Sequence, residues 1–559
     1  MKISLFYWTF FLLFNFIMAE SEIKGVVKNS KNKKPIPNVN IYLKKSKTGT
    51  ISDQNGEFIL DIENYKDQLE IEFSHVAYET VFINNYNKEL IEVEMVETFL
   101  QLDDIVVTSM KCEYDLSNVP IYTEIINKNS IRESGAITLG ELMEQTPGIS
   151  KNYDIHGSFD YNLLGLDSKY ILILKDGNPI TGKFNDKVDL DQIMVSSIDR
   201  VEIIKGPGSA LYGTEAMGGV INIITGDKLN KDKIELQLRK ISYENDIKNF
   251  HNGSVGDVLS LTYQKYYKAF NFQSSLLSQR LRRNISNNSR AKDKIDKVNI
   301  DGQVGWESIS GKSNVNIKLS YFDQLDNAKE FTSSGYMISS NATNIDRKDI
   351  KINYKGVVNQ NLTFFQNINS SHYSRKYNQD GIDSTFLRTN LSKESLIDYE
   401  AKMNLNTSNF NLIGGFEYSE PGYNNMRLRD TTHSRILRGV FLQNQYKISN
   451  KANLVIGLRS DIYNKEIVNN PRLALMYNLN KQTKYRLSYG EGFRVPSILE
   501  TFIDFHNIDQ GYMVKGNPNL EPEKSKGFTI NLEYSNGNTF RLNGLAYQNF
   551  FTNKIFSDE

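Results

Sequence analysis

The sequence predicts a mainly β protein of several domains, and three observations support this class. The chain has 559 residues, several times the roughly 150 residues of an average domain. It contains 31 Tyr, 30 Phe and 36 Gly but only 11 Pro, a composition that favours β-sheet. Its C-terminal half alternates apolar and polar residues with the period of two that is typical of strands. We therefore expect an N-terminal β-sandwich, then an α+β domain, then a long antiparallel sheet.

The composition excludes several other classes. The 66 Lys and Arg balance the 66 Asp and Glu, so no global positive charge attracts nucleic acid. Residues 3–18 are the one long apolar run, which argues against a series of membrane helices. A single cysteine, Cys112, cannot form an internal disulfide. The six histidines lack metal-ligand spacing and no GxSxG motif occurs, so we expect no enzyme, no cofactor and no bound metal.

The N-terminus has the features of an export signal. Lys2 precedes the apolar run, and the small residue Ala19 follows it. We expect residues 1–19 to be a signal peptide and the mature chain to begin near Glu20. A single membrane anchor is the alternative that we favour less, because the apolar stretch is short and no basic cluster follows it.

Residues 20–97 predict a small all-β module, because short β-rich runs are separated by turns such as the one at residues 53–56. The module resembles the carboxypeptidase-regulatory-like β-sandwich that precedes many outer-membrane receptors of Bacteroidetes-type bacteria. Pro35-Ile36-Pro37, Phe58 and Tyr78 are among the residues that carry this resemblance. It is a resemblance of fold and implies no peptidase activity.

Residues 121–227 alternate between helix and strand patterns. The run TLGELMEQ predicts a helix, YILILKDG a buried strand, and SSIDRVEIIKG a helical turn followed by a strand. The glycines that follow require tight turns and close backbone packing. Lys205 and its neighbours lack the Lys and Ser or Thr of a P-loop, so we expect no phosphate site.

Three runs in this domain, residues 170–177, 198–213 and 217–225, together resemble the plug of a TonB-dependent receptor. The residues that carry the plug motif are Asp176, Gly177, Arg200, Glu202, Lys205, Gly206, Pro207, Tyr212, Gly213, Gly218 and Gly219. The residues before Gly165 depart from the Arg-Gly pair that is usual in the family. The resemblance implies that Arg200, Glu202 and Lys205 pair with charged residues of a surrounding barrel wall.

Residues 98–120 form a linker before the plug, and the family carries its TonB box at this position. The corresponding residues are Asp104, Ile105, Val106, Val107 and Thr108. β-Branched residues in tandem can add as a strand to a partner. Taken alone, they would predict an ordinary edge strand, but their position favours the TonB box. The resemblance implies that TonB, together with ExbB and ExbD, supplies energy through this segment.

Residues 228–559 predict a transmembrane β-barrel. Apolar and polar residues alternate at residues 315–321, 484–489 and 528–534. A soluble sandwich also alternates, but long strands with Tyr near their ends favour a barrel. Short and long connections alternate, as they do between the periplasmic and external sides of outer-membrane barrels.

The long connection between Glu491 and Lys524 resembles the barrel signature of the same family. The residues that carry it are Arg494, Pro496, Glu500, Asn517 and Pro518. Arg494 and Glu500 are candidates either for external ligand contacts or for pairing with the plug. Alternation places about fifteen strands in this region, whereas plugged transporters of this type have about 22. We therefore expect the sequence to lack several C-terminal strands.

These resemblances imply an outer-membrane receptor whose plug and N-terminal domain lie toward the periplasm. It would bind a scarce nutrient, with a ferric siderophore or haem as the leading candidates, and import it with energy relayed by TonB. The alternatives are a cobalamin or glycan importer, or a surface-anchored receptor or adhesin without transport. The expected partners are TonB with ExbB and ExbD, a small ligand and outer-membrane lipid, but no nucleic acid.

Overall fold

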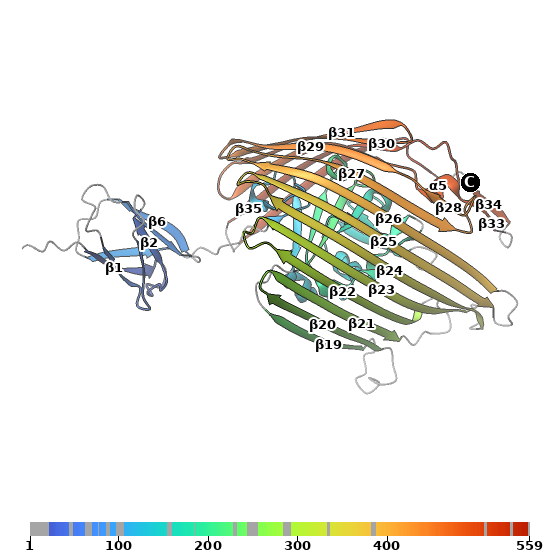
Figure 1. Ribbon diagram of the computed structural model, residues 1–559, viewed down its shortest axis with the longest axis horizontal. Coiled ribbons are helices and arrows are strands. Elements are labelled where there is room, and N and C mark those ends of the chain that lie inside the picture. The colour runs from blue at the N-terminus through green and yellow to red at the C-terminus, as the bar shows by residue number, and fades with distance from the viewer. Residues whose placement is uncertain are drawn as a thin grey trace, which may run out of the picture. The chain divides into compact units, whose positions relative to one another are not determined.

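The computed structural model (Figure 1) describes the chain in fifteen stretches. They are residues 22–43, 49–61, 70–75, 78–84, 90–96, 105–153, 159–184, 186–226, 232–242, 255–282, 292–331, 336–381, 387–507, 511–536 and 540–556. The chain divides into two compact units, Met1–Asp104 and Ile105–Glu559. The predicted signal peptide and Asp104 of the predicted TonB box lie outside the described residues.

The first unit contains the predicted β-sandwich. One sheet has the order β4 (Glu57–Asp61), β1 (Glu22–Asn29), β7 (Leu90–Met95), and the other has the order β3 (Gly49–Ile51), β2 (Asn40–Leu43), β5 (Glu70–His75), β6 (Tyr78–Asn84). Alternate residues of these strands point inward, so that Val27, Ile41 and Phe73 are fully buried between the sheets.

The second unit contains an α+β plug built on a mixed sheet. Its strand order is β10 (Thr123–Asn127), β17 (Ile198–Lys205), β18 (Gly219–Thr225), β13 (Ile171–Lys175), β14 (Asn178–Pro179). The helices are α2 (Lys128–Ser134), α3 (Leu139–Glu144) and α4 (Ser209–Tyr212). The predicted helix and both predicted strands are confirmed. Thr138 caps α3 by accepting a hydrogen bond from the backbone of Glu141. Within the described residues, no helix is long and apolar enough to cross a membrane.

Shorter elements complete the plug. They are β8 (Ile105–Val106), β9 (Tyr114–Asp115), η1 (Leu116–Asn118), β11 (Ile149–Tyr153), β12 (Phe159–Leu163), η2 (Ser168–Tyr170), β15 (Lys183–Phe184), β16 (Lys187–Val188), η3 (Leu190–Gln192) and η4 (Val195–Ser197).

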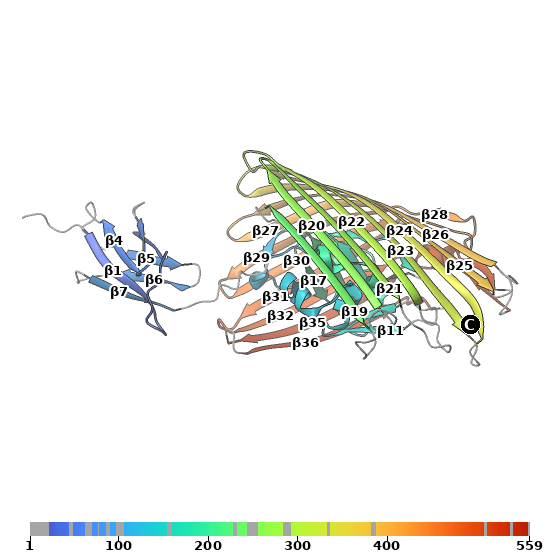
Figure 2. The same ribbon diagram turned by 90° about the horizontal axis from the view of Figure 1, so that it is seen from below.

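A large antiparallel sheet curves around the plug (Figures 1 and 2). Its strands are β19 (Lys233–Ser242), β20 (Val255–Tyr267), β21 (Phe270–Arg282), β22 (Lys292–Glu307), β23 (Ser313–Phe331), β24 (Met337–Val357), β25 (Leu362–Gly381), β26 (Leu387–Asn406), β27 (Phe410–Asn425), β28 (Thr432–Ser434), β29 (Leu437–Ser449), β30 (Ala452–Tyr463), β31 (Glu466–Asn478), β32 (Thr483–Arg494), β35 (Glu523–Ser535) and β36 (Arg541–Thr552). Of these 16 strands, β28 pairs with β27 alone, and the rest pair in sequence order. The main path therefore has the fifteen strands that alternation predicts.

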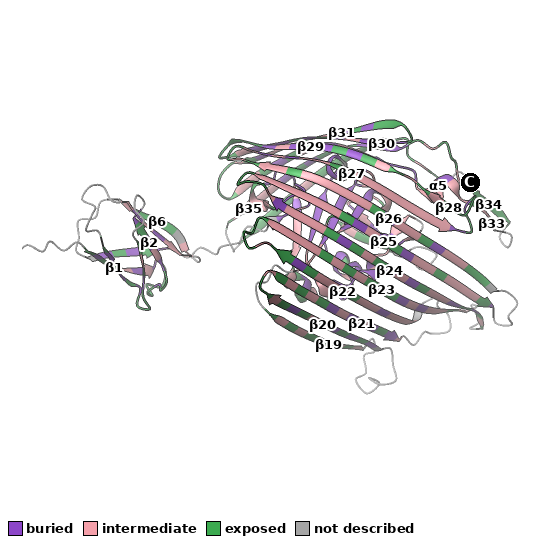
Figure 3. Cartoon of the chain, in the orientation of Figure 1, coloured by how far each residue is buried: buried purple, intermediate pink, exposed green. Residues whose placement is uncertain are grey.

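Exposed residues alternate with buried or half-buried ones along many strands of the sheet (Figure 3). Many of the exposed residues are large and apolar, and many of the buried ones are polar. On β29, Val440 and Leu442 are more than half exposed, whereas Gln443 is buried toward the plug. On β30, Leu458 is half exposed and Arg459 is buried. This arrangement is the reverse of a soluble sandwich and is that of a barrel whose outside faces lipid.

The predicted alternation of short and long connections holds at some pairs of strands and fails at others. Four residues join β31 to β32, and a long connection joins β32 to β35. The long connection carries α5 (Ile498–Phe502), β33 (Asp504–Asn507) and β34 (Tyr512–Lys515). However, β30 and β31 are joined on the long-connection side by Asn464 and Lys465 alone. Both residues have positive φ values, 48° and 71°, as a tight hairpin turn requires.

Candidate functional site

The predicted TonB box begins the second unit and is packed inside it. Ile105–Val106 forms β8, which pairs with β9. Val106 and Thr108 are fully buried. The described part of the box is therefore an inner element of the plug, whereas the sequence predicts an extended strand that is available to a partner.

A single carboxylate holds the C-terminal end of this box. Glu202, which is fully buried on β17, accepts hydrogen bonds from the backbone nitrogens of Val107 at 3.0 Å and Thr108 at 2.8 Å. The same oxygen accepts a third bond, at 2.6 Å, from the Thr108 hydroxyl. Since strand addition uses backbone donors, these two N–H groups cannot pair with a partner strand while Glu202 binds them.

Two further side chains of the plug bind Thr108. The Asn222 amide donates to its hydroxyl at 2.9 Å, and the Tyr212 hydroxyl donates to its carbonyl oxygen at 2.8 Å. Burial raises the pKa of Tyr212 well above its ordinary value, and the nearby Glu202 carboxylate acts in the same direction. Tyr212 is therefore a stable neutral donor.

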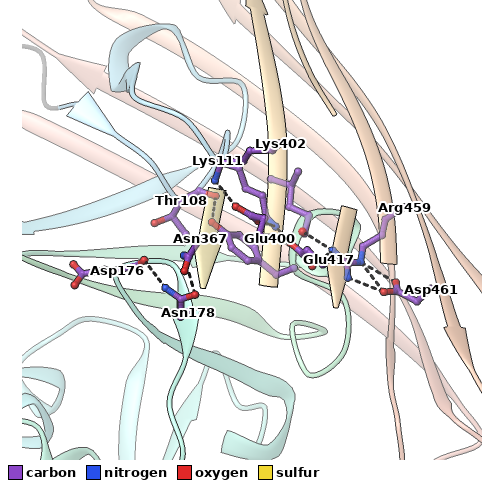
Figure 4. A network of polar contacts seen from close by, with 12 residues as sticks. Thr108, Lys111, Asp176, Asn178, Asn367, Glu400, Lys402, Glu417, Arg459 and Asp461 are labelled. Carbon is purple, nitrogen blue, oxygen red and sulfur yellow. Dashed lines mark hydrogen bonds and ion pairs between the residues drawn. The ribbon is translucent and has the colours of Figure 1, made fainter. Parts of the chain in front are cut away.

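Three residues after Thr108, the side chain of Lys111 reaches the barrel wall (Figure 4). Its ammonium group lies 2.6 Å from the Glu400 carboxylate of β26 and also contacts Glu417 of β27. Arg459 of β30 joins the same group, at 2.5 Å from Glu417 and 2.7 Å from Asp461. We call Lys111, Glu400, Lys402, Glu417, Arg459 and Asp461 the ionic cluster. It contains three basic and three acidic side chains. Burial lowers the pKa of Lys111 to about 7, and the Glu400 carboxylate opposes this shift.

A cavity of about 240 Å³ lies between the plug and one side of the barrel wall. The plug contributes residues in segment 177–186 and around Tyr212, and the wall contributes residues of β25–β27, β29, β30 and β32 with residues 495–499. Along β26 the cavity extends from Glu394 to Glu400. Glu394 lies nearer the end of the barrel with the long connections, and Glu400 lies nearer the end with the short connections. The ionic cluster therefore lies at the end nearer the short connections, and Tyr212 joins this cavity to the TonB box.

Arginines and aromatic residues gather at the opposite, long-connection end. Arg375 and Arg388 lie on the inner face of β25 and β26, near the ends of these strands. Arg427 follows β27, and its guanidinium lies 4.2 Å from the centre of the Phe505 ring. Burial lowers the pKa of Arg427, and the positive charges of Arg375 and Arg388 act in the same direction. We call these three residues the arginine cluster.

The prediction that Arg200, Glu202 and Lys205 pair with charged residues of the barrel wall is wrong. Arg200 binds Glu202 at 2.8 Å within the plug. Lys205 pairs with Glu124 of β10 at 2.5 Å and donates to the carbonyl oxygen of Pro147. In the described residues, these side chains and Glu202 bind plug partners, not the barrel wall. The error arises because they face the covering segments of their own domain.

Asp176 and Gly177 form the turn after β13. The Asp176 carboxylate accepts a hydrogen bond from the Thr225 backbone nitrogen at 2.7 Å and lies 2.9 Å from Lys318 on β23. Burial opposes ionisation of Asp176, but Lys318 and the Thr225 N–H together hold its pKa below the ordinary range. The backbone nitrogen of Gly177, whose φ is +81°, donates to Asn222 at 3.0 Å. This turn ties the plug sheet to the barrel.

The glycines and the proline of the plug motif allow close packing. A side chain on Gly206 would approach Thr529 of β35 within 2.8 Å, and Pro207 packs directly on Gly490 of β32. Gly213, with a φ of +77°, lies against Arg459. Gly218 and Gly219 have no room for a larger side chain: a Cβ atom would lie 2.9 Å from Leu166 and 2.5 Å from the Ile204 carbonyl oxygen, respectively.

Arg494 and Glu500 pair with each other, at 2.8 Å. Glu500 also caps α5 in a capping box with Ser497. Arg494 contacts Glu523 of β35 as well, and Glu523 accepts a hydrogen bond from Tyr170 of the plug at 3.1 Å. The pair thus reaches the plug through Glu523. Of the other residues of the barrel signature, Pro496 lines the cavity, and Asn517 and Pro518 are exposed.

Sequence reasoning missed Lys111, its acidic partners and the arginine cluster. Lys111 lies between the recognised motifs, and its partner Glu417 is 306 residues away along the chain. One signal in the sequence could have pointed to the wall residues of these clusters: several charged residues lie on the polar, inward-facing side of predicted strands. Across the part of the chain that the structure describes, no group of three or more His, Cys, Asp or Glu side chains could hold a metal ion.

These features define a class: an outer-membrane barrel with an internal plug and a buried N-terminal segment. Family models match in the same order. A CarboxypepD_reg-like domain matches residues 23–107, a TonB-dependent receptor plug domain residues 115–220, and a TonB-dependent receptor-like β-barrel residues 241–559. The chain belongs to the TonB-dependent receptors. Its family comprises outer-membrane receptors and transporters that bind small ligands and work with TonB, and it is not a family of enzymes.

Curated relatives and solved structures agree with this class. The chain is 25% identical over 479 residues to the iron-regulated outer membrane virulence protein of Vibrio cholerae, covering 81% of this chain and 69% of that protein. It is also 25% identical to the vitamin B12 transporter BtuB of Photobacterium profundum, covering 77% and 67%.

Among solved structures, the siderophore receptor PirA of Pseudomonas aeruginosa aligns with a TM-score of 0.60 at 17% identity, covering 77% of this chain and 74% of that one. The ferric enterobactin receptor PfeA of the same organism aligns at 0.63 and 14% identity, covering 77% and 72%. At these identities, the two alignments show that the fold is similar.

Proposed function

We propose that this receptor imports a ferric siderophore or haem, and that TonB, energised with ExbB and ExbD, drives the import through residues 104–108. The barrel would hold the plug within outer-membrane lipid, with the TonB box on the periplasmic side. The arginine cluster is the observation that favours this ligand class. One guanidinium against an aromatic ring, with the charges of Arg375 and Arg388 acting on it, suits an anionic ligand with aromatic or conjugated groups, because arginine forms charge-assisted hydrogen bonds and aromatic rings stack.

The names of the similar proteins fit two ligand classes. The iron-regulated protein of Vibrio cholerae, PirA and PfeA support an iron complex. The similarity to vitamin B12 transporters keeps cobalamin as the second candidate. An arginine cluster favours an anionic ferric tricatecholate or haem over cobalamin, which carries little net charge.

Uptake measurements test this proposal. Cells that express the protein are offered radiolabelled ferric enterobactin, haem or cyanocobalamin, with an intact box or with Val106→Pro. Proline removes a backbone donor, so this variant should bind ligand normally but import none. Import of cyanocobalamin alone would replace the iron proposal. Import that continues in the Val106→Pro variant would place the TonB-binding segment elsewhere. Binding without import in the intact protein would favour a receptor that does not transport.

A further inference from the structure

Contacts between the plug and the wall differ from one side of the barrel to the other. Toward β32 and β35, Pro207 packs on Gly490 and Gly527, where an added Cβ atom would approach the Pro207 ring within 3.1 Å and 2.9 Å. Toward β36, the rings of Tyr170 and Phe551 lie 5.2 Å apart. Toward β25–β30, the cavity of about 240 Å³ separates the same two parts. The plug is therefore closely packed on β32, β35 and β36, whereas toward β25–β30 a cavity interrupts its contacts with the wall, although Met110 and Leu211 still pack on Phe441 and Val455 there.

The end of this cavity nearer the short connections is closed by the ionic cluster. Glu400, Glu417 and Arg459 line the cavity, and the buried ammonium of Lys111 joins the first two. Lys111 also lies over the Tyr212 ring, 5.0 Å from its centre. Lys111 is the member of this cluster that belongs to the plug, and only two residues separate it from the TonB box.

The plug segment that borders the cavity makes polar contacts with the wall, among them a 2.9 Å hydrogen bond from the Asn367 amide of β25 to the Asn178 side-chain oxygen. The Thr181 hydroxyl lies 2.6 Å from that of Ser371 on β25. The Glu394 carboxylate of β26 accepts hydrogen bonds from the backbone nitrogens of Gly182 at 2.8 Å and Lys183 at 2.9 Å. Ligand pockets usually have about 300–1,000 Å³, so segment 177–186 has to move before a siderophore can fit.

We propose that the ligand passes through this cavity, between plug segment 177–186 and strands β26–β30, while the plug stays packed on β32 and β35. Tension on the TonB box reaches Lys111 three residues further along the chain. Its withdrawal separates the plug from Glu400 and Glu417 and opens the closed end of the cavity. This inference rests on the proposed transport function.

Two disulfide pins test the route. Thr181→Cys with Ser371→Cys would fix segment 177–186 to β25, since the two hydroxyl oxygens are 2.6 Å apart. Pro207→Cys with Gly490→Cys would fix the packed side, because a Cβ atom on Gly490 would lie 3.3 Å from that of Pro207. The disulfide range is about 3.5–4.5 Å, so a small shift suffices. Both pairs are made in a Cys112→Ser background, and mass spectrometry verifies each bond.

Uptake of radiolabelled ferric enterobactin, haem and cyanocobalamin is measured with each pin oxidised and reduced. We expect the Thr181–Ser371 pin to lower uptake at least tenfold, with recovery on reduction, and the Pro207–Gly490 pin to leave uptake unchanged. The route is wrong if the Pro207–Gly490 pin blocks uptake or if the Thr181–Ser371 pin does not. The reduced proteins are their own folding controls. If they import none of the three compounds, the transport proposal has failed.

A second measurement examines the route without knowledge of the ligand. Ser419→Cys places a thiol on the cavity wall, and Thr529→Cys places one on β35 against the plug. Cells are treated with a membrane-impermeant maleimide, with the TonB complex active or with a proton uncoupler. Energised labelling should rise at position 419 and remain low at position 529. A rise at 529, or no rise at 419, overturns the route.

Discussion

The Tyr212 hydroxyl donates a 2.8 Å hydrogen bond to the carbonyl oxygen of Thr108, and the same side chain lines the cavity between plug and wall. One residue therefore contacts both the space available to a ligand and the segment expected to bind TonB. Any ligand that displaces the Tyr212 ring also weakens a bond that keeps Thr108 buried.

The first prediction concerns this bond. Tyr212→Phe keeps the ring and removes the hydroxyl, which costs about 0.5–1.5 kcal/mol for a neutral hydrogen bond. Local opening of the box should become about two- to tenfold more frequent, and limited proteolysis at residues 105–110 should accelerate by that factor. Tyr489→Phe is the matched control, because its hydroxyl binds Glu491 on the barrel. Equal acceleration in both variants would mean that the effect is not specific to the box.

The second prediction concerns Glu202. Glu202→Gln preserves the shape of the side chain but removes the charge that holds the donors of Val107 and Thr108. Hydrogen bonds to a charged group contribute about 1.5–3 kcal/mol each. Hydrogen exchange at these two amides should therefore become at least tenfold faster. Glu235→Gln, at an exposed ion pair with Arg132, should leave their exchange unchanged. Unchanged exchange in the Glu202 variant would show that other contacts bury the box.

The architecture could be predicted from sequence because its signals are local. Strand alternation depends on neighbouring residues, so the sequence predicts about fifteen barrel strands, and in the described residues fifteen follow one another along the sheet. The helix at residues 139–144 has its cap at Thr138, directly before the apolar run. Each of these features is contained in a short window of the chain.

The site was less predictable because its contacts join distant parts of the chain. Glu202 belongs to the plug motif. Nothing near it in the sequence shows that its carboxylate binds the backbone of Val107 and Thr108, which lie 95 and 94 positions earlier. Lys111 and Glu400 are 289 residues apart, and neither belongs to a recognised motif. Which inward-facing charges meet depends on how the plug is rotated within the barrel, and periodicity does not encode that rotation.

The third prediction uses Cys112, the one cysteine of the chain, as a reporter for Lys111. Cys112 is 4% exposed, and burial raises the pKa of its thiol to about 11, so at pH 8 the thiol is protonated and reacts slowly. Lys111→Met leaves Glu400 and Glu417 without this partner, and breaking a buried ion pair costs about 3–5 kcal/mol. Maleimide labelling of Cys112 at pH 8 should accelerate at least tenfold.

Lys402→Met is the control for that experiment. Lys402 belongs to the same ionic cluster, at 2.5 Å from Glu400, but it is part of the barrel wall. Its loss disturbs the charge balance without detaching the plug segment, so Cys112 labelling should change much less. If both variants label alike, the general stability of the cluster controls exposure of Cys112, and Lys111 has no special position.

The fourth prediction concerns the arginine cluster. Arg427→Ala removes a guanidinium that lies against Phe505 at the end of the barrel that carries the long connections. Loss of a charge-assisted contact with an anionic ligand costs about 1.5–3 kcal/mol, which corresponds to about 10- to 100-fold weaker binding of ferric enterobactin or haem. Arg438→Ala, at an exposed position on β29, is the matched control and should bind the ligand normally.

Salt screens exposed charges, so the affinity of the unaltered protein for the ligand should fall with ionic strength more steeply than the affinity of the Arg427→Ala variant. Equal affinities of Arg427→Ala and Arg438→Ala for both ligands would contradict a role of the cluster in anion binding and would favour a ligand of little net charge, such as cobalamin.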